Sequence, residues 1–248
     1  LLMVAPYATQ DVLMRVEGPL TSRPYVDMTI DVMRDMGVEA LATDEGRFVV
    51  PAFQRYQAGT YAIEPDASAA TYFWAAAAIT GGRIRVEGLT RRSRQGDVGF
   101  VDVLAQAGCA LHVDDTGLEV AGPADGRLAG IDVDLNTMPD TVQTLAVAAL
   151  FASGPTHIRN VANLRIKETD RIAALATELT RLGARVETRP DGLTIQPPER
   201  LRPAEIRTYD DHRMAMSFAL AGLVTEGVVI QDADCVSKSF PGYFDVLG

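Results

Sequence analysis

Hydrophobic and polar positions along this chain repeat one order of elements three times. Three segments each read as the end of a helix, a glycine and a hairpin of two strands: residues 33–50, 103–120 and 175–195. The glycines lie 71 and then 75 positions apart, at Gly37, Gly108 and Gly183. A glycine after a helix is the usual left-handed cap, and the alternating apolar residues that follow predict half-buried strands. Glu45 and Gly46 form the predicted turn of the first hairpin.

A second pattern lies between these hairpins. An aspartate opens each of three apolar helices that are rich in alanine or methionine, at Asp66, Asp140 and Asp211. Each helix ends near a glycine and a short β-rich run, at Gly82, Gly154 and Gly227. The two patterns combine into a unit of strand, helix, strand, helix, strand, strand (βαβαββ), about 70 residues long.

The chain holds two complete units and two partial ones on this interpretation. Residues 1–62 lack the opening of their unit and are the predicted remainder of an N-terminal-side domain. Residues 63–248 form the predicted second domain, whose last unit lacks its closing hairpin. Because the chain begins inside what reads as the end of an apolar helix, we expect an N-terminal part to be missing and to supply that hairpin. Residues 57–60 are the candidate crossover between the domains.

The composition adds limits on the class of protein. With 47% hydrophobic and 23% charged residues, 248 residues bury a sizeable core, which excludes disorder and collagen-like structure. No apolar run reaches the roughly 18 to 20 residues that cross a bilayer, and the start lacks the basic flank of a signal peptide. Only Cys109 and Cys235 occur, too few for a disulfide framework or a thiolate metal site. These features predict a cytoplasmic protein that does not bind membranes.

The net charge of −10 excludes a broad basic face for nucleic acid, while anionic small molecules remain possible ligands. The loop before each second helix carries a basic residue at nearly the same offset, at Arg94, Lys167 and Lys238. Helix N-termini present free N–H groups and partial positive charge, so basic side chains there favour an anion site. The sequence shows no GxxxxGK[ST] loop, HExxH or GxSxG motif, and the three histidines are dispersed.

Structural alternatives exist for each of these segments. In residues 167–171, Thr169 could be an N-cap and Arg171 could pair outward with an acid. Asp210 or Asp211 could cap the next helix, Asp140 reads as a plain N-cap, and Lys238 alone reads as a surface lysine. Against these alternatives, two cations and an acid within one turn can hold an anion and leave a carboxylate free to move protons.

Two motifs carry a resemblance to a known family. They are Asn163-Leu164-Arg165-Ile166-Lys167-Glu168-Thr169-Asp170-Arg171 and Asp210-Asp211-His212-Arg213-Met214-Ala215-Met216. With residues 1–5, 22–25, 66–68, 138–140 and 238–241, they closely resemble the 5-enolpyruvylshikimate-3-phosphate (EPSP) synthase family. The resemblance covers essentially the whole chain, which corresponds to the C-terminal 60% or so of such an enzyme.

The resemblance implies an α/β fold of repeated βαβαββ units, a two-domain inverse α/β barrel-like enolpyruvyl transferase fold with an active site in the cleft. It implies transfer of the enolpyruvyl group of phosphoenolpyruvate to the 5-hydroxyl of shikimate 3-phosphate. Phosphate is released, a tetrahedral intermediate forms, and no metal or organic cofactor is needed. The step belongs to the shikimate pathway, which leads to chorismate and the aromatic amino acids. The family is usually monomeric.

The same resemblance implies roles for individual residues. Asp140 would bind the shikimate hydroxyls and is the candidate acceptor of the 5-hydroxyl proton. Glu168 is the candidate for proton transfer at the methylene carbon, and Lys238 would meet the phosphate of phosphoenolpyruvate. The implied substrate-binding residues are Ser22 and Tyr25 at the 3-phosphate, Asn163 and Lys167 at the shikimate ring, Arg171 and Arg213 at the phosphoenolpyruvate carboxylate, and His212 as support.

Family residues that form the other wall of the site would precede Leu1, so we expect the chain alone to be inactive. Two alternatives stay open at this point. One is the related transferase that moves enolpyruvyl to UDP-N-acetylglucosamine, which shares the architecture, although the two motifs favour the shikimate enzyme. The other is a non-catalytic repeat domain that only binds anions.

Overall fold

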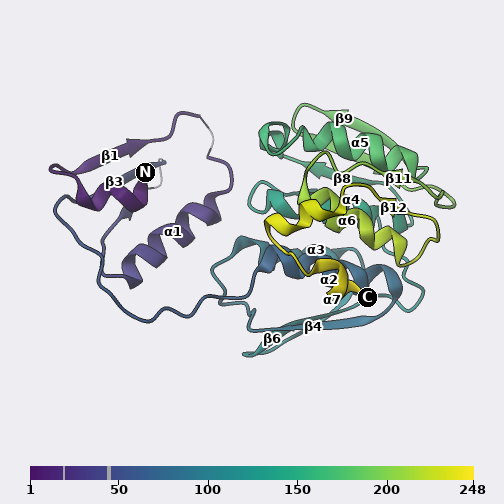
Figure 1. The fold of residues 1–248 in the computed structure, drawn as a ribbon, viewed down its shortest axis with the longest axis horizontal. Coiled ribbons are helices and arrows are strands. Elements are labelled where there is room, and N and C mark those ends of the chain that lie inside the picture. The colour runs from purple at the N-terminus through teal and green to yellow at the C-terminus, as the bar shows by residue number, and fades with distance from the viewer. Residues whose placement is uncertain (19, 44–45) are drawn as a thin grey trace. The chain divides into compact units, whose positions relative to one another are not determined.

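The computed structural model describes residues 1–18, 20–43 and 46–248, which form two compact units (Figure 1). The first unit comprises Leu1–Glu64 and Arg94–Gly96, and the second comprises Pro65–Ser93 and Asp97–Gly248. The domain boundary between residues 62 and 63 stays a prediction. The described part of the chain contains no helix long and apolar enough to cross a bilayer.

The first unit is one helix on a small antiparallel sheet of order β1-β3-β2. Its elements are η1 (Leu2–Tyr7), β1 (Val12–Arg15), α1 (Arg23–Asp35), β2 (Leu41–Ala42) and β3 (Arg47–Val50). Gly37 follows α1 with φ 79°, as a left-handed cap requires. The predicted helix, glycine and strand order is confirmed here, while Glu45 of the predicted turn lies outside the described residues.

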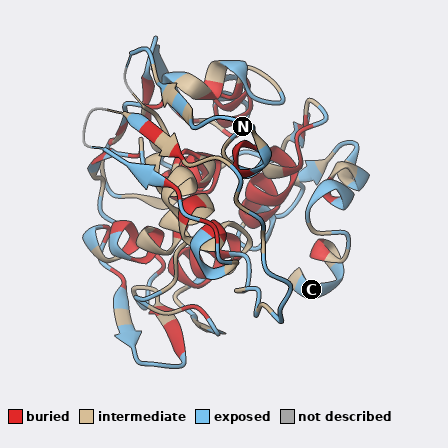
Figure 2. Cartoon of the chain, turned by 90° about the vertical axis from the view of Figure 1, so that its left-hand side faces the viewer, coloured by how far each residue is buried: buried red, intermediate tan, exposed pale blue. Residues whose placement is uncertain are grey.

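Three apolar helices form the centre of the second unit. They are α2 (Ala67–Thr80), α4 (Val142–Ala148) and α6 (His212–Gly222), and each contacts the other two. Figure 2 shows buried segments concentrated in the central helices. A chain of hydroxyls links them: Thr71 lies 3.2 Å from Thr144, which lies 3.4 Å from Ser217, and each step is 73 residues. Equivalent positions of successive units therefore meet side by side, which supports the repeat.

Sheets and second helices surround this centre. Following α2 come β4 (Arg83–Glu87), η2 (Gly96–Gly99), α3 (Phe100–Gln106), β5 (Ala110–Val113) and β6 (Gly117–Ala121). Around α4 lie β7 (Asp132–Asp134), η3 (Pro139–Thr141), η4 (Ala149–Phe151), β8 (Thr156–Arg159), η5 (Ala162–Ile166), α5 (Arg171–Arg181), β9 (Arg185–Arg189) and β10 (Gly192–Gln196). Around α6 lie β11 (Glu205–Ile206), β12 (Val229–Ile230), η6 (Ala233–Lys238) and α7 (Tyr243–Leu247).

The sheets confirm most of the predicted unit. The middle unit is complete, with order β7-β8-β10-β9, and Gly183 precedes its hairpin with φ 105°. Residues 205–248 contain the parallel pair β11-β12, and the composition of the last unit stays a prediction.

One detail of the prediction is wrong. The first unit of the predicted second domain has no opening strand among the described residues, because residues 51–66 pair with no strand and its sheet is β4-β6-β5. Helix α2 ends near Gly82, as predicted, and its left-handed cap is Gly81, with φ 71°, whose N–H donates to the carbonyl of Ala77.

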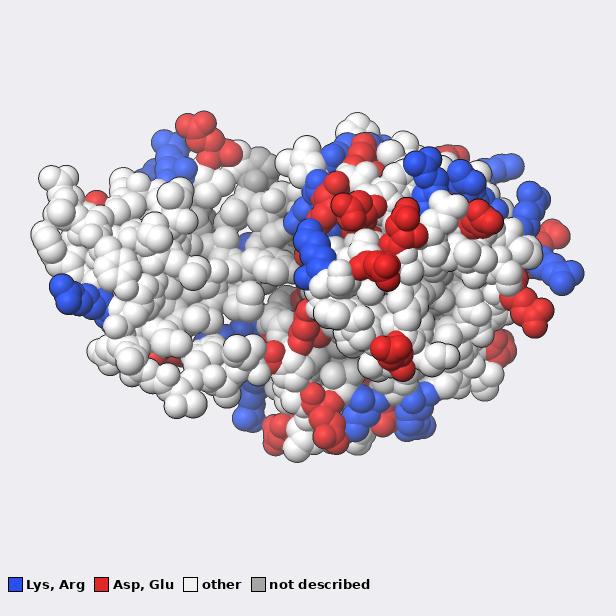
Figure 3. Space-filling model, viewed as in Figure 1, with Lys and Arg blue, Asp and Glu red and all other residues white. Residues whose placement is uncertain are grey.

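Charged side chains of both signs are interspersed over the second unit in the view of Figure 3. That face shows no broad basic surface of the kind that binds a phosphate backbone, in keeping with the net charge of −10.

Candidate active site

Arg171 is the centre of a charged cluster at the start of α5. Asp170 caps this helix by accepting a hydrogen bond from the N–H of Ala173 at 3.0 Å, so the predicted cap at Thr169 is wrong. The side chain of Arg171 is only 1% exposed, so the predicted outward pairing is also wrong. A guanidinium buried to this degree is stable only when carboxylates surround it.

Three carboxylates supply this compensation. Nε of Arg171 lies 2.7 Å from Oδ2 of Asp211, and Nη1 lies 3.2 Å from Oδ1 of Asp140. Nη2 lies 2.7 Å from Oε2 of Glu168. The pairing with Asp211 is two-pronged, because Nη2 also reaches Oδ1 at 3.2 Å. Such fork geometry fixes the plane of the guanidinium as well as its position.

Asp211 has two roles, of which sequence analysis found one. It caps α6, as one alternative predicted, because Oδ1 accepts from the N–H of Arg213 at 2.9 Å. It is also fully buried against Arg171, from another unit of the repeat. Only the overall fold brings these two residues together, so no local pattern could have indicated the second role.

Asp140 points into the cluster and does not cap a helix. Neither η3 nor α4 has a side-chain cap, so the N-cap interpretation of Asp140 is wrong. Its carboxylate accepts from Nη2 of Arg213 at 3.0 Å and lies 3.7 Å from Nζ of Lys167. Burial opposes its ionisation, but Arg213, Lys167 and Arg171 together lower the pKa of Asp140 below its usual 3.8. Asp140 is therefore an ionised base in contact with three cations.

Glu168 bridges two cations at the more open side of the cluster. Its Oε1 lies 2.6 Å from Nζ of Lys238, and its Oε2 contacts Arg171. Burial opposes ionisation, yet the hydrogen bond from Lys238 and the charges of Arg171 and Lys238 lower the pKa of Glu168 to about 2. In this state Glu168 is ionised and is a weak base, and it can take up and pass on a proton only after its cations are drawn away.

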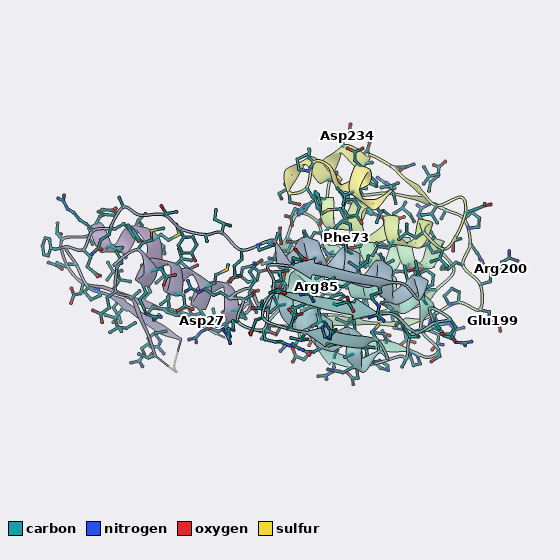
Figure 4. All side chains as sticks on the ribbon, turned by 90° about the horizontal axis from the view of Figure 1, so that it is seen from below. Asp27, Phe73, Arg85, Glu199, Arg200 and Asp234 are labelled. Atoms are coloured by element: carbon teal, nitrogen blue, oxygen red, sulfur yellow. The ribbon has the colours of Figure 1, made fainter. Side chains whose placement is uncertain are left out.

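Ring contacts place the segment that carries Lys238. Phe73, labelled on α2 in Figure 4, packs its ring 6.1 Å from Phe240 and 6.0 Å from Tyr243, measured between centroids. Both Phe240 and Tyr243 follow η6 in the chain, so their packing on Phe73 holds the end of η6 against α2. The side chain of Lys238 itself stays 56% exposed, which leaves its ammonium available to a ligand.

Two further predicted residues carry buried polar atoms that make no hydrogen bond within the described structure: Oδ1 of Asn163 and Nδ1 of His212, which lies 3.8 Å from Oδ1 of Asp211. A buried atom of this kind is usually satisfied by water or a ligand. Burial, together with the charge of Arg213, lowers the pKa of His212 below 6.5, so its imidazole is neutral at pH 7.

Tyr72 is a member of the cluster that sequence analysis missed. Its hydroxyl lies 3.4 Å from Nη1 of Arg213, and burial raises the pKa of Tyr72 to about 12, which keeps it neutral. In the sequence it is one aromatic residue in an apolar helix, and such residues are nearly always core. Its position one turn inside the helix start was the only available signal.

Ser22 and Tyr25 belong to the first unit. Ser22 is the N-cap residue of α1 with φ 55° and makes no side-chain cap, while its carbonyl accepts from the N–H of Tyr25 at 3.1 Å. Their participation in the same site as the second-unit residues stays a prediction. Arg94, the first of the three basic loop residues, is likewise grouped with the first unit.

The second-unit cluster combines four cations with three carboxylates: Lys167, Arg171, Arg213 and Lys238 with Asp140, Glu168 and Asp211. Such an arrangement can bind a multiply charged anion and move protons beside it. Among the described residues, no three His, Cys, Asp or Glu side chains gather as metal ligands would.

Comparison with known proteins decides the family. The family model described as EPSP synthase (3-phosphoshikimate 1-carboxyvinyltransferase) matches residues 1–247. The chain belongs to the EPSP synthase family. The resemblance drawn from residues 163–171 and 210–216 is thereby confirmed.

Relatives of the family agree over the whole chain. A Nostoc punctiforme protein named 3-phosphoshikimate 1-carboxyvinyltransferase is 54% identical over 244 residues, which is 98% of this chain and 57% of that protein. A Yersinia ruckeri protein of the same name is 49% identical over 248 residues, 100% of this chain and 57% of that protein. The chain therefore spans 57% of the length of these relatives.

A solved structure of EPSP synthase from Acinetobacter baumannii confirms the fold class. It superposes with a TM-score of 0.82 at 25% identity and covers 99% of this chain and 57% of that one. The predicted mixed α/β fold of the enolpyruvyl transferase kind is the observed one.

A first prediction concerns the neutral His212. Because its pKa is lower in the folded than in the unfolded chain, folding keeps it deprotonated, so the free energy of unfolding falls as the pH drops below about 6.5. His212→Gln removes this contribution. Urea unfolding between pH 5 and 8 should show a shallower pH slope for His212→Gln than for the unsubstituted chain. The control is His112→Gln, whose side chain is 67% exposed, and equal slopes for both variants would refute the prediction.

Proposed function

We propose that this chain supplies one wall of an active site that transfers the enolpyruvyl group of phosphoenolpyruvate to the 5-hydroxyl of shikimate 3-phosphate. Family membership and the names of the relatives support the reaction. The observation that carries the proposal is the cluster around Arg171, where two guanidiniums, two ammoniums and three carboxylates converge. Both substrates are polyanions, which is the class of ligand that such a cluster suits.

The first step is addition. The oxygen of the 5-hydroxyl bonds to C2 of phosphoenolpyruvate, Asp140 takes the hydroxyl proton, and Glu168 gives a proton to the methylene carbon, which becomes a methyl group. In the second step the bond from C2 to the phosphate oxygen breaks, the proton taken up by Asp140 passes to the departing phosphate, and Glu168 takes a proton back from the methyl group. Both carboxylates act as acid and base in turn, so no net proton is consumed within the site.

Cations stabilise the charge that these steps create. Arg171 and Arg213 hold the carboxylate of phosphoenolpyruvate, because a planar fork matches a planar carboxylate. Lys238 binds the phosphate of phosphoenolpyruvate. Lys167 and Asn163 contact the shikimate ring. Ser22 and Tyr25 contact the 3-phosphate of shikimate 3-phosphate, and His212 supports the cluster. When a phosphate draws Lys238 from Glu168, the pKa of Glu168 rises from its low value in the empty site, which lets it carry the proton.

We propose further that a segment outside this chain completes the last unit. In the middle unit β8 pairs with β7 on one edge and with β10 on the other, whereas within the described part of the chain β12 pairs only with β11. Beside β12 an apolar groove of about 240 Å³ is lined by Ala219, Leu223, Val228, Ile230, Phe244, Leu247 and Gly248. An antiparallel hairpin on the free edge of β12 would cover this groove and occupy the place that β10 and β9 have in the middle unit.

Amide exchange tests this completion. The part of the Nostoc punctiforme relative that this chain does not match should slow exchange at Ile230 when it is added. Val229 is not informative, because its N–H already donates to the carbonyl of Ala204 at 3.0 Å. The control is the paired strand β10, where Ile195 should exchange at the same rate with and without the added part. Unchanged exchange at β12 in a preparation that forms the complex would contradict the hairpin.

The reaction itself is tested by product analysis of the same combined preparation. Phosphoenolpyruvate is supplied with equal amounts of shikimate 3-phosphate and UDP-N-acetylglucosamine, and the products are identified by mass spectrometry. We expect enolpyruvyl-shikimate 3-phosphate and phosphate alone, and none from the chain without its complement. An enolpyruvyl product on UDP-N-acetylglucosamine would favour the related UDP-sugar transferase instead. Anion binding without phosphate release would favour a non-catalytic repeat domain.

The setting of the reaction follows from the same family. We propose that the step serves chorismate and aromatic amino-acid biosynthesis in the cytoplasm and that the complete protein acts as a monomer. Both cysteine thiols, Cys109 and Cys235, are free, which supports a reducing compartment.

A further inference from the structure

Glu178 on α5 is a completely buried carboxylate. Its Oε1 accepts from the hydroxyl of Tyr209 at 2.7 Å, and its Oε2 accepts from the backbone N–H of Arg207 at 3.3 Å. Oε2 also lies 3.2 Å from Nε of Arg181, which satisfies the charge. Carboxylates are almost never fully buried unless paired in this way, and two of these three partners belong to one loop.

That loop, residues 207–211, has an unfavourable backbone. Tyr209 and Asp210 are consecutive residues with φ 57° and 56°, and neither is glycine. Residues other than glycine rarely adopt the left-handed region of backbone conformation. They keep it only where surrounding contacts hold the backbone in place. Besides Glu178, the loop is held by the N–H of Asp211, which donates to the carbonyl of Thr208 at 3.0 Å, and by the guanidinium of Arg207 5.4 Å over the ring of Tyr209.

The same loop carries Asp211 to Arg171, the centre of the active-site cluster. Arg171 and Glu178 lie on one helix, seven residues and so about 10 Å apart along its axis. Helix α5 thus holds the loop at two points: Glu178 binds it at Tyr209, and Arg171 binds it at Asp211. Because Tyr209 is only two residues before Asp211, release of the first point frees the backbone that places the second.

We propose that Glu178 is a positioning residue for the active site, which acts through Tyr209 and the left-handed loop to set the Asp211–Arg171 pair. This inference rests on the proposed function, because Arg171 is there assigned to the carboxylate of phosphoenolpyruvate. Glu178 itself contacts no substrate. It sets the position of the Arg171 guanidinium before phosphoenolpyruvate binds.

Tyr209→Phe is the principal test, because it removes one hydroxyl and keeps the ring. In the combined preparation described above we expect the KM for phosphoenolpyruvate to rise about 5- to 20-fold, the worth of one hydrogen bond to a charged group, with kcat within about threefold. Thr180→Ala is the matched control on the same helix, since that hydroxyl donates to the carbonyl of Ala176 at 2.6 Å, within the helix itself.

Amide exchange in the chain alone gives a second readout that needs no activity. Tyr209→Phe should speed exchange at Asp211 and Arg213 at least about tenfold relative to Thr180→Ala, with β10 unchanged. A KM and exchange rates equal to those of Thr180→Ala would overturn the inference, as would a fall in kcat with no change in KM. If the combined preparation makes no product, the proposed function fails, and the exchange rates alone then decide whether Glu178 holds the loop.

Discussion

Glu168→Gln lowers the turnover of the combined preparation by about 10²- to 10⁴-fold, the usual contribution of a positioned acid–base group. The amide keeps one acceptor oxygen, for either Lys238 or Arg171, but can neither take nor give the proton at the methylene carbon. Substrate affinity should change little, because Arg171, Arg213 and Lys238 remain in place.

The measurement is the steady-state rate of phosphate release, together with hydrogen exchange into the methylene group of phosphoenolpyruvate in D₂O. Glu187→Gln, an exposed glutamate on β9, is the control and should leave both unchanged. Turnover of Glu168→Gln within a few-fold of the parent would remove Glu168 from the proton-transfer role.

Asp211→Ala destabilises the chain by about 3–5 kcal/mol, because it leaves the buried guanidinium of Arg171 without its two-pronged partner. Loss of the cap of α6 adds about 1 kcal/mol. Asp140 and Glu168 still contact Arg171, so a folded state with a displaced guanidinium is expected rather than complete unfolding.

Asp66→Ala provides the matched control for this effect. Asp66 opens α2 and caps it by accepting from the N–H of Ala69 at 3.1 Å, but it pairs with no buried arginine. Urea unfolding should therefore show a loss of about 1 kcal/mol for Asp66→Ala and a several-fold larger loss for Asp211→Ala. Equal losses would mean that Asp211 is only a cap.

The repeat was predictable because it is encoded in local chemistry. A glycine that ends a helix and the alternating apolar residues after it reflect local backbone preferences, which do not depend on distant contacts. The hairpin after Gly183 formed as expected. The missing strand before α2 was not predictable, because a strand exists only where another strand pairs with it.

The sequence predicted which loops carry the site residues, but not which of their side chains contact one another. Asp66, Asp140 and Asp211 look alike in sequence, yet Asp66 caps a helix, Asp140 binds cations without capping one, and Asp211 does both. What separates them is whether an arginine from another unit lies opposite. Tyr72 and Glu178 were missed for the same reason: each reads as an ordinary helix residue until the first turn of α6 or the loop before it packs against it.

The most direct test of this account is a crystal structure of the combined preparation carrying Glu168→Gln, which slows turnover, with phosphoenolpyruvate and shikimate 3-phosphate bound. We expect the carboxylate of phosphoenolpyruvate between Arg171 and Arg213, its phosphate at Lys238, and the 5-hydroxyl within hydrogen-bond distance of Asp140. Phosphoenolpyruvate bound away from both guanidiniums, with Arg171 still paired to Asp140 and Asp211 and Arg213 still paired to Asp140, would contradict it.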